Sequence, residues 1–308
     1  MFQRTVDKIV EFEGLGLHSG VQASVRILPA GAGEGITFVR TDIPGAPRIK
    51  AAHKNLVSTS FATTIGKDGV TVGTVEHILS ALYGLGVDNA VIEVSGLEIP
   101  IMDGSAMPIV DMIEVAGLRK LDATRKYMVI EKPIRVVDHD RFVYFMPASK
   151  NEQEDGLSVD YTIDFAQPYL ENQSFSFSFT RKAFKKELAS ARTFGYLKDV
   201  EMLKKNGLAR GGSLDNAVVI GDEDILNKEG LRFHDEFVRH KVLDLLGDLA
   251  LLGVPVVGKL QAFRAGHGLN QRLVGKVLET PSSWKRLELV EDDFPKLFPA
   301  LRKDLITA

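Results

Sequence analysis

The segment from His240 to Asp248 constrains the fold of this chain more than any other. It reads His-Lys-Val-Leu-Asp-Leu-Leu-Gly-Asp, and its four aliphatic residues are typical of a buried helix. On a helix, His240, Asp244 and Asp248 lie four residues apart on one face. Burying an imidazole and two carboxylates is unfavourable unless a partner compensates for the lost hydration. The spacing therefore predicts that His240 and Asp244 share a metal ion, and that Asp248 orients another group nearby.

A segment in the first half of the chain resembles this one. His77 and Asp244 each begin a mostly apolar stretch of ten residues that closes at a glycine, and a strand-like segment follows each stretch. We interpret the likeness as an internal duplication of a strand–helix–strand unit, with one candidate metal ligand at the same place in each copy. Chance similarity between two buried helices is the alternative.

The duplication predicts an α+β fold. We expect two similar two-layer domains of sheet and helix, residues 1–125 and 126–308, that pack with their helices facing and hold the active site between them. This packing would bring His77 next to Asp244. The polar segment 120–126 marks the expected boundary, and the first helix is expected over 75–85 with Thr74 as its N-cap.

The amino-acid composition limits the metal chemistry. The chain has no cysteine, so a zinc ion must use histidine and carboxylate ligands. Two histidines and one carboxylate, with a fourth position open to water, are the ligands of a catalytic zinc, although Fe(II) accepts the same set. Zinc lowers the pKa of its bound water to roughly 7. Glu76 directly precedes His77 and is therefore the candidate general base.

Length and charge indicate the class of protein. The chain has 308 residues, a formal net charge of −3 and 44% hydrophobic residues, as in an ordinary soluble protein. Nothing in this balance favours nucleic-acid binding. The first residues lack the apolar core of a signal peptide. No run of ~18 apolar residues exists, so no transmembrane segment is expected. We expect a cytoplasmic protein that acts as a monomer.

His267 is the candidate general acid. It stands between Gly266 and Gly268 after a predicted strand, so we expect it to be exposed and mobile. An ordinary loop histidine is the alternative. Asp248 favours the catalytic interpretation, because its carboxylate can accept a hydrogen bond from His267 and raise the pKa of the imidazole.

Several motifs, in order along the chain, resemble one known family. They include Thr74-Val75-Glu76-His77, Glu98-Ile99-Pro100-Ile101-Met102-Asp103-Gly104-Ser105, Ala191-Arg192-Thr193-Phe194-Gly195 and the segment from His240 to Asp248. Essentially the whole chain is similar to the UDP-3-O-acyl-N-acetylglucosamine deacetylases, the zinc amidases of lipid A synthesis. Many members carry a cysteine in the segment that here reads Ser60-Phe61-Ala62-Thr63-Thr64, so any role of that thiol does not carry over.

The resemblance implies a role for each candidate residue. Zinc would be held by His77, His240 and Asp244. Glu76 would be the base, His267 the acid that protonates the leaving amine, and Asp248 the residue that orients His267. Thr193 would stabilise the oxyanion and Lys241 would add positive charge near the site. A UDP-linked acylated amino sugar would contact Phe194, Lys241 and Arg264, the last at its diphosphate; a solvated surface charge is the alternative for Arg264.

The family also carries an insert in its second domain that walls a passage for the acyl chain. Here the insert is expected near 196–212, where Leu197, Val200, Leu203 and Leu208 form a helical apolar stripe. Plain core packing is the alternative for the stripe. Two other functions stay open at this point: a related zinc amidase acting on another acylated sugar, and a non-catalytic binding protein in which zinc is structural.

Overall fold

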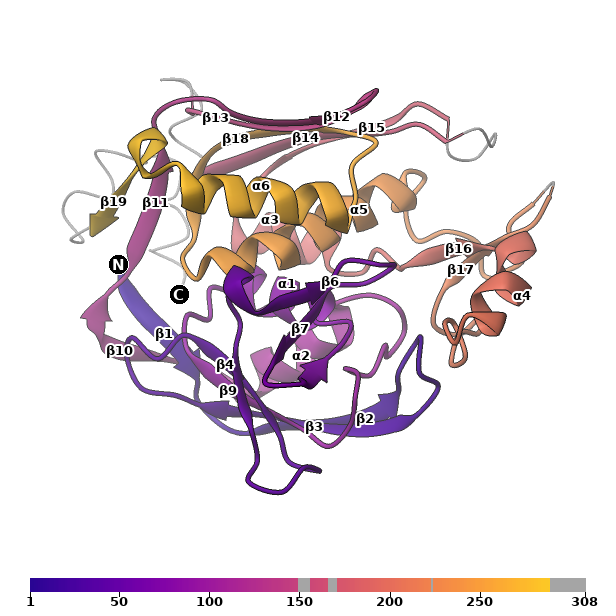
Figure 1. The fold of residues 1–308 in the computed structure, drawn as a ribbon, viewed down its shortest axis with the longest axis horizontal. Helices are drawn as coiled ribbons and strands as arrows, with labels where there is room; N and C mark the ends of the chain where they lie inside the picture. The colour runs from indigo at the N-terminus through magenta and orange to yellow at the C-terminus, as the bar shows by residue number, and fades with distance from the viewer. Residues whose placement is uncertain (149–155, 166–170, 223, 289–308) are drawn as a thin grey trace.

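Two sheets form the outside of the molecule, and helices fill the space between them (Figure 1). The structure is a computed structural model and describes residues 1–148, 156–165, 171–222 and 224–288. Helices α1 and α2 cover the first sheet, and α5 and α6 cover the second, so that α1 and α5 pack against each other in the centre. The predicted α+β class is confirmed.

The first half contains ten strands and two α-helices. The strands are β1 (Phe2–Val6), β2 (Val10–Leu15), β3 (Gln22–Pro29), β4 (Ile36–Arg40), β5 (Arg48–Lys50), β6 (Leu56–Ser58), β7 (Thr64–Lys67), β8 (Val70–Val72), β9 (Ala90–Val94) and β10 (Leu118–Thr124). The helices are α1 (Glu76–Leu85) and α2 (Met107–Ala116), with the short helix η1 (His53–Asn55).

The described part of the second half contains nine strands and four α-helices. The strands are β11 (Lys126–Ile130), β12 (Ile134–Asp138), β13 (Arg141–Met146), β14 (Leu157–Ile163), β15 (Gln173–Ser178), β16 (Phe194–Tyr196), β17 (Val218–Ile220), β18 (Val256–Phe263) and β19 (Trp284–Glu288). The helices are α3 (Arg181–Ala183), α4 (Leu197–Lys205), α5 (Glu236–Leu249) and α6 (His267–Glu279), with the short helical turns η4 (Phe184–Leu188), η5 (Ala250–Leu252) and η6 (Pro281–Ser283).

The two sheets repeat one topology. The first has the order β2-β3-β9-β4-β5, and five strands of the second follow the order β12-β13-β18-β14-β15. In both, the central strand pairs antiparallel with one neighbour and parallel with the other. Each central strand also follows the buried helix that carries candidate metal ligands, α1 or α5. This correspondence supports the predicted duplication and domain halves, which stay predictions.

Hydrophobic patterning explains the layers. Side chains of β14 alternate strictly between buried and partly buried positions, as expected of a strand with one face on the core. Helices α1 and α5 are instead buried on nearly all sides. The two sheets enclose this pair in the interior, and the polar residues His240, Asp244 and Asp248 of α5 are buried together with its apolar ones. No helix among the described residues is long and apolar enough to cross a membrane.

One local prediction was wrong. Thr74 does not cap α1: its φ is 53° and its hydroxyl donates to Glu98 Oε1 at 2.7 Å, while the N-cap is Val75. Most of the polar segment 120–126, the expected boundary, belongs to β10, which pairs with β1, and the boundary itself stays a prediction. After Thr280, β19 pairs with β11.

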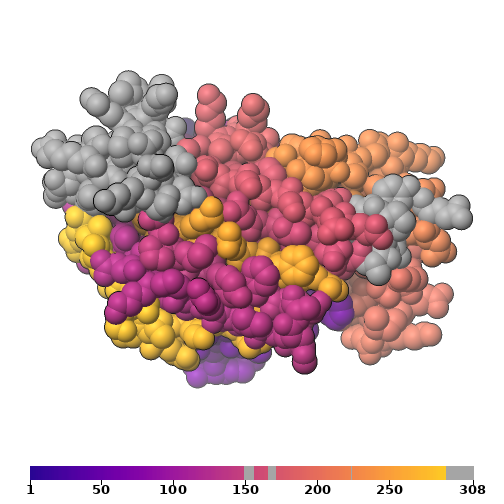
Figure 2. Space-filling model, turned by 90° about the horizontal axis from the view of Figure 1, so that it is seen from above, coloured from indigo at the N-terminus to yellow at the C-terminus, as the bar shows by residue number. Residues whose placement is uncertain are grey.

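The predicted insert region projects from one end of the molecule. Strands β16 and β17 form a small parallel pair, and α4 lies between them in sequence (Figure 1). Seen from above, these residues occupy one end of the molecule, beyond the strands of the second sheet (Figure 2). Leu197 and Met202 on α4 are 51% and 48% exposed, and none of the residues of α4 is buried. Plain core packing therefore does not explain the apolar stripe on α4.

Candidate metal centre and active site

His77, His240 and Asp244 come together where α1 crosses α5. The Oδ1 atom of Asp244 lies 3.2 Å from His240 Nε2 and 3.5 Å from His77 Nε2. One ligand atom from each residue lies within 4.8 Å of the others, and all three residues are buried. This is the group within the described ranges that could hold a metal ion.

The surroundings of Asp244 fit a bound cation. Its Oδ1 atom is buried and accepts no hydrogen bond from any described residue. A buried anionic oxygen facing two imidazole nitrogens is unfavourable unless something compensates for its charge. A divalent metal bound by two imidazoles and a carboxylate would do so.

Hydrogen bonding and charge prepare His240 to bind a metal. Its Nδ1 lies 3.0 Å from the carbonyl oxygen of Ala191, which fixes the proton on Nδ1 and leaves the lone pair on Nε2. Burial lowers the pKa of His240 to about 3, although Asp244 opposes the shift. Burial also disfavours the charged form of Asp244, but the imidazoles and Lys241 more than offset this and keep its pKa well below its usual range. At neutral pH the group thus offers neutral His240 and ionised Asp244.

Glu76 lies beside this group at the start of α1. Its Oε2 accepts a hydrogen bond from the backbone N–H of Thr63 at 3.0 Å, and its Oε1 lies 3.8 Å from His267 Nε2. Burial raises the pKa of Glu76, and His267 and His77 oppose the rise. A carboxylate with a raised pKa is better suited to accept a proton near neutral pH than an exposed one.

His267 is buried, so the prediction of an exposed, mobile loop histidine was wrong. It is 9% exposed and is the first residue of α6. Its Nδ1 lies 3.0 Å from Asp248 Oδ2, and its Nε2 lies 3.8 Å from Asp244 Oδ2. Burial alone would lower the pKa of His267, but Asp248, Glu76 and Asp244 together raise it to about 9. Residues from α5 and α1 therefore surround the imidazole and favour its protonated form.

Lys241 and Phe194 lie beside the metal-ligand group, and Thr193 directly precedes Phe194 in the chain. Lys241 Nζ is 2.9 Å from Asp244 Oδ2 and lies over the Phe194 ring, 5.4 Å from its centroid. The Phe194 and His240 rings pack edge to face, with 6.3 Å between their centroids. The backbone of Thr193 bonds to Gly104, and its hydroxyl has no hydrogen-bond partner among the described residues.

Arg264 is placed differently from the other predicted residues. It follows β18 with φ of 50° and forms an ion pair with Asp140. Its side chain is 40% exposed. The structure thus puts Arg264 at the surface end of the strand that leads to His267, outside the buried group.

Four groups that support the site were not identified from the sequence. They are the carbonyl of Ala191 and the side chains of Thr63, Asn270 and Gln271. The last two donate to Asp248 at 2.9 Å each. Asn270 and Gln271 follow His267 by three and four residues. This helical spacing indicates that they share a face with His267, and it could have been recognised in the sequence. Thr63 lies in the other half of the chain and gave no such signal.

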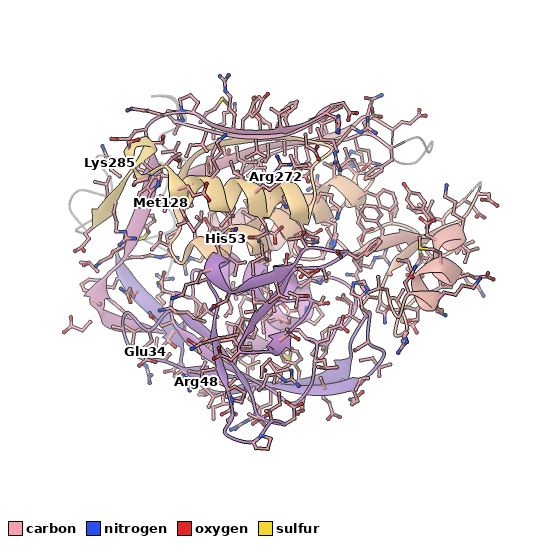
Figure 3. The ribbon with its side chains drawn as sticks, viewed as in Figure 1. Glu34, Arg48, His53, Met128, Arg272 and Lys285 are labelled. Carbon is pink, nitrogen blue, oxygen red and sulfur yellow. The ribbon has the colours of Figure 1, made fainter. Side chains whose placement is uncertain are left out.

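An open groove adjoins His267. It has a volume of about 1060 Å³ and runs between α6, β12 and the segment from η1 to Phe61. His53 lines part of the groove beneath α6 (Figure 3). Its Nε2 lies 3.0 Å from the carbonyl oxygen of Gln271. The wall of the groove has three cationic side chains, Arg141, Arg272 and Lys276, and two carboxylates, Asp138 and Glu279, and Asp138 forms ion pairs with both arginines. A groove of this size has room for a polar ligand larger than the reacting group itself.

Gly247 allows α1 and α5 to approach closely enough to form the site. A Cβ atom added there would lie 2.1 Å from the carbonyl oxygen of Glu76. Such overpacking usually costs about 1–3 kcal/mol, more than the ~1 kcal/mol that alanine gains over glycine in a helix. We therefore expect Gly247→Ala to lower the free energy of unfolding measured by denaturant titration. The control is Gly268→Ala on α6, where the added atom meets Thr59 Oγ1 at an ordinary 3.7 Å. Equal stability of the two variants would contradict the prediction.

The fold and the buried group define a class of protein. Two histidines and one carboxylate, with a carboxylate and an imidazole at 3.8 Å from each other beside them, are the arrangement of a metal-dependent hydrolase. Comparison with known protein families supports this class. The sequence profile of the UDP-3-O-acyl N-acetylglycosamine deacetylases matches residues 3–279.

The chain belongs to this family. Three relatives named UDP-3-O-acyl-N-acetylglucosamine deacetylase illustrate the similarity. That of Myxococcus xanthus (strain DK1622) is 46% identical over 98% of this chain and 91% of its own length. That of Syntrophus aciditrophicus (strain SB) is 47% identical over 92% and 88%, and that of Anaeromyxobacter sp. (strain Fw109-5) is 48% identical over 96% and 95%. The resemblance recognised from the sequence motifs is thereby confirmed.

Proposed function

We propose that this chain hydrolyses the N-acetyl group of UDP-3-O-acyl-N-acetylglucosamine to give the free amine and acetate, a step of lipid A biosynthesis, and that zinc is the metal. The observation that carries the proposal is the buried group of His77, His240 and Asp244 next to Glu76 and His267 in a chain of this family. The cytoplasmic location and monomeric state expected from the sequence stay predictions.

The metal would be held by His77, His240 and Asp244. When bound, it would polarise the amide carbonyl and lower the pKa of a water molecule. Glu76 accepts a proton from the attacking water as the oxygen–carbon bond forms. His267 then gives its Nε2 proton to the amine nitrogen as the carbon–nitrogen bond breaks, which gives a neutral amine and acetic acid. The acid leaves as acetate after returning its proton to His267, and Glu76 releases its proton to water. Thr193 donates its free hydroxyl to the carbonyl oxygen while negative charge develops on it.

The substrate's two ends have different surroundings in this proposal. The groove beside His267 receives the anionic nucleotide, since its three cationic side chains, Arg141, Arg272 and Lys276, outnumber its two carboxylates, Asp138 and Glu279. The exposed apolar side chains of α4, such as Leu197 and Met202, receive the acyl chain. Their exposure to water is unfavourable in the free chain and would be relieved by a lipid.

A substrate panel tests the function. The purified, metal-loaded chain should release one acetate from each long-chain UDP-3-O-acyl-N-acetylglucosamine, as seen by mass spectrometry of the sugar product. Elemental analysis should find about one zinc per chain, as a site with three protein ligands requires. UDP-N-acetylglucosamine without the acyl chain, and the acylated sugar without UDP, serve as matched controls and should react much more slowly.

The controls also separate the alternatives. An equal rate without the nucleotide would favour an amidase for another acylated sugar. A chain that binds zinc but releases no acetate from any of the three compounds would be a binding protein, and the proposal would be wrong.

A further inference from the structure

Thr63 joins the two halves of the site. It lies just before β7 in the first half and is completely buried. Its hydroxyl donates to Asp248 Oδ1 on α5 at 2.5 Å, and the same oxygen lies 3.2 Å from His267 Nδ1. Its backbone N–H donates to Glu76 Oε2 at 3.0 Å. One residue thus contacts the candidate base, the candidate acid and the carboxylate that orients the acid.

The hydrogen bonds around Asp248 determine the direction of the Thr63 contact. Asp248 Oδ1 accepts from Thr63 and Gln271, and Oδ2 faces His267 and Asn270. An ionised carboxylate can only accept, so the single proton of the Thr63 hydroxyl goes to Asp248. The Thr63 oxygen can then only accept from His267. Both neighbours of His267 Nδ1 are therefore acceptors.

We propose that Thr63 is a positioning residue that, together with Asp248, keeps a proton on His267 Nδ1 and leaves Nε2 as the nitrogen that exchanges protons with the substrate. Nε2 is the ring atom that faces Glu76 and Asp244, each at 3.8 Å. The backbone N–H of Thr63 holds Glu76 Oε2 in the same way and leaves Oε1 toward His267. The relative positions of the acid His267 and the base Glu76 are thus fixed, because Thr63 contacts both.

This inference rests on the proposed deacetylase function, and the experiment has two independent measurements. The first is steady-state deacetylation by the zinc-loaded chain carrying Thr63→Val, which keeps the shape of the side chain and removes the hydroxyl. We expect kcat to fall by roughly 10–100-fold, the usual effect of losing a residue that orients a ligand or catalytic group, with KM changed by less than about threefold. Thr63→Ser, which keeps the hydroxyl, should restore most of kcat.

The second measurement needs no substrate. In protein labelled with ¹⁵N-histidine, the Nδ1–H proton of His267 should give a slowly exchanging NMR signal, assigned by its absence in His267→Gln. The signal should persist in Thr63→Ser and be lost or broadened by fast exchange in Thr63→Val. Gln271→Leu is the matched comparison, because it removes another donor to Asp248 Oδ1 without touching His267; its Nδ1–H signal should remain.

Three results would overturn the positioning role of Thr63. They are an unchanged kcat in Thr63→Val, a loss of kcat in Thr63→Ser as large as in Thr63→Val, and an Nδ1–H signal of His267 that survives in Thr63→Val. If Thr63→Val fails to fold, Thr63→Ala, which removes the hydroxyl without adding a methyl group, is measured instead. If the unmodified chain releases no acetate, the proposed function fails, while the NMR comparison still tests whether Thr63 fixes the proton on His267.

Discussion

Asp244→Asn is expected to remove both the metal and the activity. The substitution keeps the size of the side chain but takes away the charge that faces two imidazole nitrogens at 3.2 and 3.5 Å. A catalytic metal provides several kcal/mol of transition-state stabilisation, and each ~1.4 kcal/mol is a tenfold change in rate. We therefore expect deacetylation to fall by about 10³-fold or more, and the metal content, measured by elemental analysis after dialysis, to fall close to zero.

The matched control is Asp111→Asn on α2, which removes the same charge from a side chain that is 59% exposed. It should retain metal and activity. Thorough chelation of the unmodified chain should reproduce the Asp244→Asn result, and returning zinc should reverse it. Full activity in the chelated chain would show that the reaction needs no metal and would refute the assignment of the site.

His267→Gln is expected to lower kcat by about 10²–10⁴-fold, the usual contribution of a positioned general acid. An acid acts only while protonated, so the rate of the unmodified chain should fall as the pH rises through the pKa of His267. That pKa is about 9 without metal, and a bound cation would lower it because like charges repel. The alkaline fall in kcat should be absent in His267→Gln. A variant that keeps the same pH profile would rule out His267 as the acid.

The raised pKa also makes the stability of the metal-free chain depend on pH. In the unfolded chain a histidine has a pKa of roughly 6.5, below the value of about 9 in the folded state. Protonation of His267 therefore stabilises the fold fully below about pH 6.5, and this stabilisation is lost as the pH rises through 9. Thermal melts between these limits should show a decline for the unmodified chain that is smaller for His267→Gln.

The sequence predicted the architecture where patterning is strong. The mostly apolar ten-residue stretches at His77 and Asp244 fall on buried helices, the first on α1 and the second on the end of α5 and on η5. The prediction for Thr74 was wrong because of a contact that is not local. Its hydroxyl could cap a helix, but the distant Glu98 accepts its proton together with the backbone N–H groups of His18 and Ser19. A capping rule that considers neighbours alone does not include such a competitor.

Part of the candidate site was predictable from local spacing. His240, Asp244 and Asp248 are on one helix, so their spacing in the sequence determines their relative positions. The burial of His267 was missed because the flanking glycines indicated a loop, whereas Gly266 ends the connection and α6 begins at His267 itself. The contact between Thr63 and Asp248 joins residues 185 positions apart, so no local sequence pattern indicates it.

The crossing of α1 and α5 has a consequence for how the protein matures. His77 is synthesised well before His240 and Asp244, so the nascent first half offers an incoming ion only one imidazole of the set. A tightly held ion must wait until α5 has docked against Glu76 through Gly247. An unfinished or misfolded chain therefore lacks the full ligand set and cannot retain the metal. An ion that binds only the folded state shifts the folding equilibrium toward the folded state by mass action.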